Sequence, residues 1–114
     1  MNLILQPGNT RSSAALDYLI ESRLIALTDR QRIEEAVVRL DDHREGSPRY
    51  QASIMIRVPG PDIHAVACDP TLRVAVQKAL DAVERQVAAR QGRRHVRRRS
   101  RLQLSRAART GRGW

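Results

Sequence analysis

The residues best suited to do chemistry in this sequence are arginines near its C-terminal end. Arg93, Arg94, Arg97, Arg98, Arg99 and Arg101 place six guanidinium groups within nine residues. Guanidinium groups form forked hydrogen bonds with phosphate and stack on bases, so this cluster is typical of a nucleic-acid partner. Residues 90–114 contain ten arginines and no acid, whereas residues 1–89 contain eleven basic and twelve acidic residues. A nearly neutral body with a strongly positive end predicts binding to a polyanion; a merely solubilising tail is the simpler alternative.

A second set of basic residues belongs to the predicted helix before this cluster. Lys78 and Arg85 lie opposite its apolar stripe, and Arg90 lies near its end. Such a helix could follow a phosphate backbone, although an ordinary solvated helix face is the alternative. The chain has one Trp, two Tyr and no Phe. This scarcity of stacking residues favours recognition of structured RNA by its shape and backbone over a platform for single strands.

The sequence shows no set of residues that would converge on a catalytic site. His64 and Cys68 lie on the same face of one predicted strand, but they are four positions apart and therefore separated by about 13 Å. Cys68 is the only cysteine, which excludes an internal disulfide and a cysteine-rich metal site. Phosphate-binding glycine loops and metal-ligand spacings are absent as well. We therefore expect no enzyme activity, no cofactor, no metal and no small-molecule substrate.

The elements that must position the basic residues follow from hydrophobic periodicity. Apolar residues at spacings of three and four predict one helix with Leu16, Ile20 and Leu24 on its buried face. A second helix begins at Asp69-Pro70, an Asp cap followed by Pro, and buries a stripe that includes Val76. Alternating residues and flanking turns predict the strands. The predicted strands cover residues 2–6, 33–41, 50–58 and 63–68, and the predicted helices cover 13–28 and 70–90.

The order β-α-β-β-β-α predicts an α+β fold in which two helices cover one face of a four-stranded sheet. The first two strands should be parallel because a helix connects them, and residues 50–58 and 63–68 should form a hairpin. The other sheet face should be open to water, since apolar and polar residues alternate along the strands. A chain of 114 residues holds one domain. We expect that domain at residues 1–90 and an Arg-rich, disordered tail at residues 91–114.

Membrane spans and signals are not evident. No segment reaches the roughly 20 apolar residues that cross a bilayer, and the start, MNLILQPG, lacks the charged region of a secretory signal. We therefore expect no membrane partner and a cytoplasmic location.

Several short motifs, in order, resemble the ribosome hibernation-promoting factors, also called ribosome-associated translation inhibitors. Each motif is weak alone, but their order and spacing over residues 1–90 are fairly specific. Those of the first strand and helix are Met1-Asn2-Leu3, the turn at Asn9, Ala15-Leu16-Asp17-Tyr18-Leu19 and Arg23-Leu24. Those of the strand-turn signature and second helix are Ile56-Arg57-Val58-Pro59-Gly60, Asp69, Ala75-Val76, Asp81 and Glu84-Arg85-Gln86.

The resemblance implies a fold similar to double-stranded RNA-binding domains and a non-enzymatic, bacterial protein. It implies binding to the small ribosomal subunit and its rRNA in the decoding channel, in stationary phase or stress. Arg23 and Arg85 match basic sites of the family, and Arg90 lies close to others. Family members often carry Lys or Arg where this chain has Gly8, so the basic surface of the body is thinner here.

Two other interpretations stay open at the level of sequence. The same fold could serve as a general RNA- or DNA-binding module with a different nucleic-acid target. Alternatively, the open sheet face, with Met55 and Val66, could dock a protein partner.

Overall fold

The computed structural model describes residues 1–6 and 8–102, with side chains for residues 1–6 and 8–92. The predicted element order β-α-β-β-β-α is confirmed. The elements are β1 (Asn2–Gln6), α1 (Ala14–Leu27), β2 (Glu35–Asp42), β3 (Tyr50–Arg57), β4 (Ile63–Asp69) and α2 (Leu72–Leu102).

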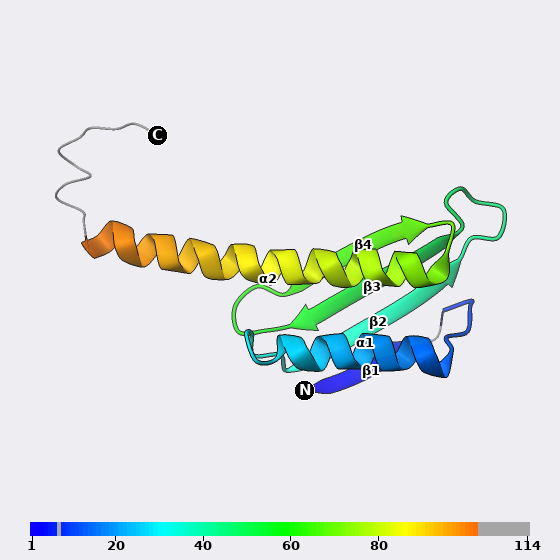
Figure 1. Ribbon diagram of the computed structural model, residues 1–114, viewed down its shortest axis with the longest axis horizontal. Coiled ribbons are helices and arrows are strands. Elements are labelled where there is room, and N and C mark those ends of the chain that lie inside the picture. Colours follow the sequence, from blue (N-terminus) through cyan, green and yellow to red (C-terminus); the bar gives the residue numbers. More distant parts are fainter. Residues whose placement is uncertain (7, 103–114) are drawn as a thin grey trace.

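The four strands form one sheet in the order β1-β2-β3-β4. β1 pairs with β2 in parallel, with Leu3 opposite Ala36, and α1 forms the connection between them. The β2–β3 and β3–β4 pairs are antiparallel. Both helices lie on the same face of this sheet, as Figure 1 shows. The α+β fold expected from the sequence is therefore confirmed, including the single covered face.

The core lies between the helices and the covered sheet face, and it is aliphatic. From α1, Ile20 and Leu24 are fully buried, and Val76 and Val83 are fully buried from α2. They pack on alternate residues of the strands, because successive side chains of a strand point to opposite faces. These strand residues are Ala36, Val38, Leu40, Ala52, Ile54, Ile56, Ile63 and Ala65.

The start of α1 is fixed by a side-chain cap. Ser13 is extended and its hydroxyl oxygen accepts a hydrogen bond from the Leu16 amide at 3.1 Å. This cap satisfies one of the backbone donors that the first turn of a helix leaves unpaired. Thr28 ends the helix, so both predicted boundaries of α1 agree with the structure to within one residue.

The predicted end of the second helix is wrong. α2 runs without a break to Leu102, twelve residues beyond the expected end at residue 90. Arginine is a good helix former, and no proline follows Pro70, so a lone Gly92 does not stop the helix. Residues 91–102, assigned above to a disordered tail, are helical, and residues 103–114 lie outside the described part of the chain. The division into a domain and a functional tail stays a prediction.

Leu5 of β1 points toward the core but is not buried. Leu5 faces the helices, as its pairing with buried Val38 requires, yet it is 41% exposed. β1 is an edge strand, and its outer side has no neighbouring strand to bury the leucine. Leu5 instead lines a shallow cavity of about 330 Å³ with Arg11, Asp17 and others.

The second sheet face is open, as predicted. Gln51, Ser53 and Met55 are half-buried there, and Arg39 and Arg57 are exposed. The other edge strand adds His64, Val66 and Cys68 to the same face, all exposed. Within residues 1–6 and 8–102, neither helix is both long and apolar enough to cross a membrane.

Candidate nucleic-acid interface

The basic residues predicted on the body come from the two helices, but most of them already have partners. Arg23 projects from α1 toward α2 and forms ion pairs with Asp81 and Glu84, both at 2.7 Å. Its Nε also donates to Glu84 at 3.1 Å. Burial opposes the charge of Arg23, but the hydrogen bonds to Asp81 and Glu84 outweigh it and raise the pKa of the guanidinium. Arg23 therefore joins the two helices, with only 26% of its side chain exposed.

Lys78 forms an ion pair inside the body as well. Its ammonium group donates to Asp69 at 2.8 Å, and the same carboxylate accepts from the Thr71 amide at 2.9 Å. The hydrogen bond from Lys78, followed by that from Thr71, lowers the pKa of Asp69. Lys78 thus neutralises the carboxylate at the start of α2, although its side chain stays half exposed.

Arg90 attaches α2 to the turn between β3 and β4. Its Nη2 donates to the carbonyl oxygen of Pro61. Its Nη1 is buried and has no hydrogen-bond partner among the residues described. Next to it, the Gln91 amide donates to the carbonyl of Arg30, just after α1. These two contacts fix the helix where the sheet ends.

Arg85 is the predicted body residue that faces solvent freely. It is exposed, and the described part of the chain supplies no ion pair to it. The other predicted residues, Arg93, Arg94, Arg97, Arg98, Arg99 and Arg101, all lie on the last turns of α2. The structure therefore brings the six together along one helix, directly beyond Arg90.

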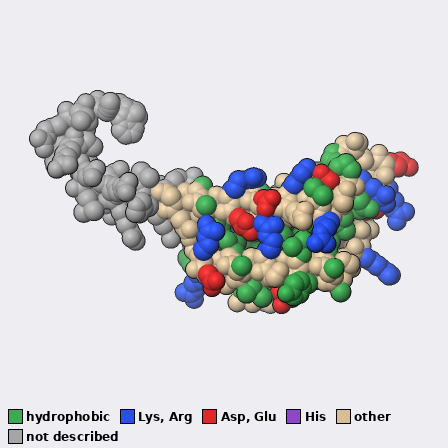
Figure 2. All heavy atoms as spheres, viewed as in Figure 1, with side chains coloured by type: hydrophobic (Ala, Val, Ile, Leu, Met, Phe, Trp, Pro, Cys, Tyr) green, Lys and Arg blue, Asp and Glu red, His purple; other side chains and the backbone are tan. Residues whose placement is uncertain are grey.

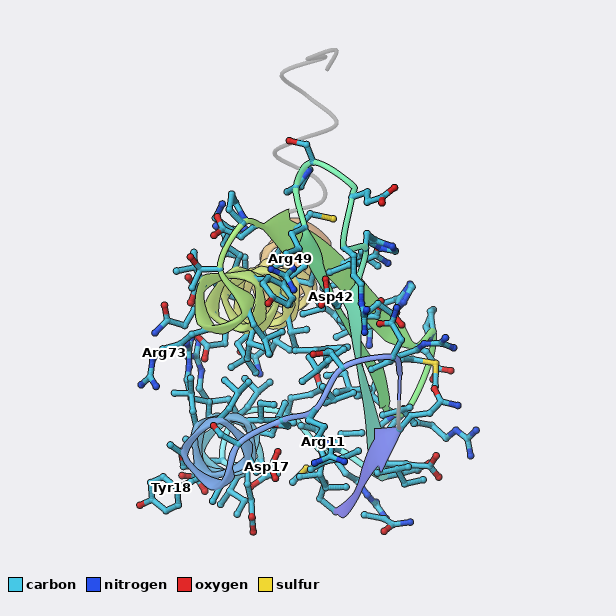
Figure 3. The ribbon with its side chains drawn as sticks, turned by 90° about the vertical axis from the view of Figure 1, so that its right-hand side faces the viewer. Arg11, Asp17, Tyr18, Asp42, Arg49 and Arg73 are labelled. Atoms are coloured by element: carbon cyan, nitrogen blue, oxygen red, sulfur yellow. The ribbon has the colours of Figure 1, made fainter. Side chains whose placement is uncertain are left out.

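The end of the molecule where both helices begin carries arginines that the sequence analysis did not select. Figure 3 shows Arg11, Arg49 and Arg73 there, on the loop after β1, the segment before β3 and the first turn of α2. Arg11 and Arg44 line a cavity of about 520 Å³. The observed topology places these arginines at one end, because β1, β2 and β4 run in one direction and the loops that follow them lie at the same end of the sheet.

Acidic residues reduce the positive charge of that end. Arg49 donates two hydrogen bonds to the carboxylate of Asp42, of 2.8 and 3.0 Å, and these lower the pKa of Asp42. Asn9 exchanges hydrogen bonds with the backbone of Asp42. Gly8 allows this close approach, since a Cβ there would lie 1.9 Å from the carbonyl oxygen of Leu40. The loop is therefore fixed by internal contacts.

The helical face of the body is mixed in charge. Figure 2 shows Lys and Arg side chains interspersed with Asp and Glu across it. In the described part of the chain, no three His, Cys, Asp or Glu side chains gather into a group that could hold a metal. The concentrated positive charge lies on the last turns of α2, so the arrangement is suited to a long polyanion.

Comparisons with known proteins agree with this architecture. The family described as sigma 54 modulation protein / S30EA ribosomal protein matches residues 4–95. Among solved structures, the N-terminal domain of Thermus thermophilus Protein Y is similar, with 28% identity and a TM-score of 0.64 over 76% of this chain and 96% of that one. A ribosomal subunit interface protein from Coxiella burnetii has the same fold, at 19% identity and a TM-score of 0.67 over 81% of this chain and 99% of that one. No curated protein matches the chain.

Proposed function

The chain belongs to the sigma 54 modulation protein / S30EA ribosomal protein family and is a ribosome-associated protein, and on this premise we propose that it inhibits translation by binding the small ribosomal subunit. Its target is the rRNA of the decoding channel, and it acts in the cytoplasm in stationary phase or stress. It holds ribosomes idle by occupying a site and catalyses no reaction. The observation that carries the proposal is the family match over residues 4–95, which begins within β1, ends within α2 and includes every element between them.

The chemistry of the surface supports recognition through the RNA backbone. Phosphate contacts come from guanidinium groups that are not already neutralised. On the body, Arg85 meets that condition. Arg23 and Lys78 would have to weaken their ion pairs with carboxylates before they could contact a phosphate. We therefore expect Arg85 to contribute more to binding than either of them.

The charge distribution gives the last part of the chain the leading role in attraction. The body has no net positive charge, so it exerts no long-range pull on a polyanion. Ten arginines without an acid follow from residue 90 onward. Their neutralisation of phosphates releases counterions, and this makes binding strong at low salt.

Two measurements test the proposal. In a cell-free translation extract, excess purified protein should inhibit synthesis. In gradients at about 50 mM salt, where phosphate contacts are strong, the protein should sediment with small subunits and not with large subunits. Full translation activity together with absence from the small-subunit fractions would reject the proposal. Equal affinity for naked duplex RNA and for small subunits would favour the general RNA-binding module instead.

A pair of charge reversals tests the face involved. Arg85→Glu changes the helical side, and Arg39→Glu makes the same charge change on the open sheet face, where Arg39 is 52% exposed. The first variant should bind small subunits more weakly and lose about 0.7–0.9 from the slope of log affinity against log salt, the value for one phosphate contact. The second should keep the wild-type slope. If both variants lose the same amount, net charge alone governs binding and the helical side is not the contact face.

A further inference from the structure

The last part of α2 extends beyond the rest of the folded body. Figure 1 shows the helix continuing past the end of the sheet. The last described contacts between α2 and the body are made by Arg90, which donates to Pro61 in the β3–β4 turn, and by Gln91, which donates to Arg30 just after α1. Residues 92–102 continue as helix for about 16 Å, at about 1.5 Å per residue. We call residues 90–102 the arm.

The arm continues the face of α2 that packs on the sheet, but with a different residue type. Spacings of three and four connect the buried residues Val76, Leu80, Val83 and Val87 into one stripe. The same spacings place positions 90, 94, 97 and 101 on that face. All four are arginine. The face thus changes from aliphatic to cationic at Arg90, the residue that marks the end of the sheet.

This row suits the phosphates of a nucleic acid. Positions three or four apart on a helix are separated by about 5 Å along its axis, close to the spacing of successive phosphates in one strand. No acid follows Glu84 to neutralise the row. A membrane surface fits less well, because an interfacial helix needs a continuous apolar face and the arm has only Val96 and Leu102 as large apolar residues.

We propose that the arm is a pre-ordered RNA-binding site. Arg90 holds its base on the body through Pro61, and the arginines at positions 94, 97 and 101 contact phosphates of a structured RNA. The proposal rests on the proposed function, because that function identifies the structured RNA as rRNA. A helix that already exists in the free protein loses less conformational entropy on binding than a coil would. The site therefore depends on helical continuity as well as on charge.

Substitutions at Gly92 change the continuity of the α2 helix without changing any charge. A Cβ at Gly92 would meet nothing within 4 Å, so Gly92→Ala is accommodated and favours the helix. Gly92→Pro breaks the helix at the base of the arm. Both variants keep every charge of the full chain.

The first experiment measures the affinity of the wild type and both variants for an RNA duplex of about 20 base pairs, longer than a double-stranded RNA-binding domain covers, at several salt concentrations. Gly92→Ala should bind as tightly as the wild type or more tightly. Gly92→Pro should bind about tenfold more weakly and, if about two phosphate contacts are lost, with a slope smaller by about 1.5. Equal affinities and slopes for all three proteins would overturn the proposal.

A second experiment moves arginines around the helix without changing composition. The full chain carries Val96→Arg with Arg97→Val, and Arg101→Leu with Leu102→Arg. Each exchange shifts one guanidinium by about 100° around the helix axis, off the row. A helical arm predicts weaker binding and a smaller slope, whereas an open coil of the same charge would bind like the wild type. Wild-type binding by this variant would overturn the proposal even if Gly92→Pro had lowered the stability of the body.

Small subunits, used as a second ligand, separate the two proposals. If none of the four proteins binds subunits, but Gly92→Pro and the exchange variant bind the duplex more weakly than the wild type and Gly92→Ala, the proposed function fails and the proposal for the arm is supported. If all four proteins bind subunits equally and also bind the duplex equally, the proposal for the arm is overturned and the proposed function is supported.

Discussion

Arg23 and Arg85 carry the same guanidinium on the helices that cover the sheet, but their surroundings differ. Arg23 lies between two carboxylates of α2, which are 58 and 61 residues away in sequence. Arg85 forms no ion pair with the described residues and is exposed. The ion pairs of Arg23 depend on how α1 and α2 pack, so the family resemblance that singled out Arg23 did not predict its partners.

The ion pairs of Arg23 should contribute to stability. Replacing Arg23 with Met keeps much of its packing and removes both ion pairs. We expect the free energy of unfolding to fall by about 1 kcal/mol, the upper end for a partly exposed pair. For a domain of this size, the midpoint of thermal unfolding would fall by about 4–8 °C. Arg85→Met is the matched control and should leave the midpoint nearly unchanged. Equal shifts in both variants would show that the ion pairs of Arg23 do not stabilise the fold.

The elements show which patterns predict structure reliably. Alternation along β3 and the apolar stripes of both helices are local consequences of burial, and they gave the sheet with one covered face. The end of α2 does not depend on burial, because the stripe stops at Val87 while the helix continues to Leu102. The prediction used the loss of apolar residues as a stop signal, although arginine itself favours a helix. The exposure of Leu5 has a related cause, because alternation along a strand predicts which face is apolar but not what covers that face.

Val76 tests the packing of α2 on the sheet. It is fully buried on the stripe that faces the sheet. Val76→Asp would place an unpaired carboxylate among aliphatic side chains, so we expect a loss of more than about 4 kcal/mol and failure to fold cooperatively. Circular dichroism during thermal unfolding measures this. Gln77→Asp, one position along on the half-buried side of the helix, is the control. A Val76→Asp protein with the wild-type midpoint would contradict the packing described here.

At the scale of the whole molecule, stabilising contacts and excess charge occupy different regions. Ion pairs on the body join carboxylates to Arg23, Lys78 and Arg49. The excess positive charge begins at Arg90, where α2 leaves the sheet. The body can therefore keep a stable, nearly neutral surface while the end of the chain supplies attraction for a polyanion.

Removing residues 93–114 tests this separation. The shortened chain keeps the contacts of Arg90 and Gln91 and should unfold at nearly the same temperature as the full chain. Its affinity for small subunits should fall sharply. If about six arginines contact phosphates, the slope of log affinity against log salt should fall by about four to five units. Equal slopes for the two chains would assign binding to the folded body, through residues such as Arg85.

The central claim, that the protein occupies the decoding channel of the small subunit, is tested most directly by competition. Labelled protein is bound to purified small subunits at about 50 mM salt, and mRNA with its matching tRNA is then added in increasing amounts. A large-subunit sample and a naked RNA duplex serve as controls for binding to rRNA in general. We expect mRNA and tRNA to displace the protein from small subunits completely, and excess protein to displace mRNA and tRNA in turn. Protein that remains bound when the channel is filled with mRNA and tRNA would contradict it.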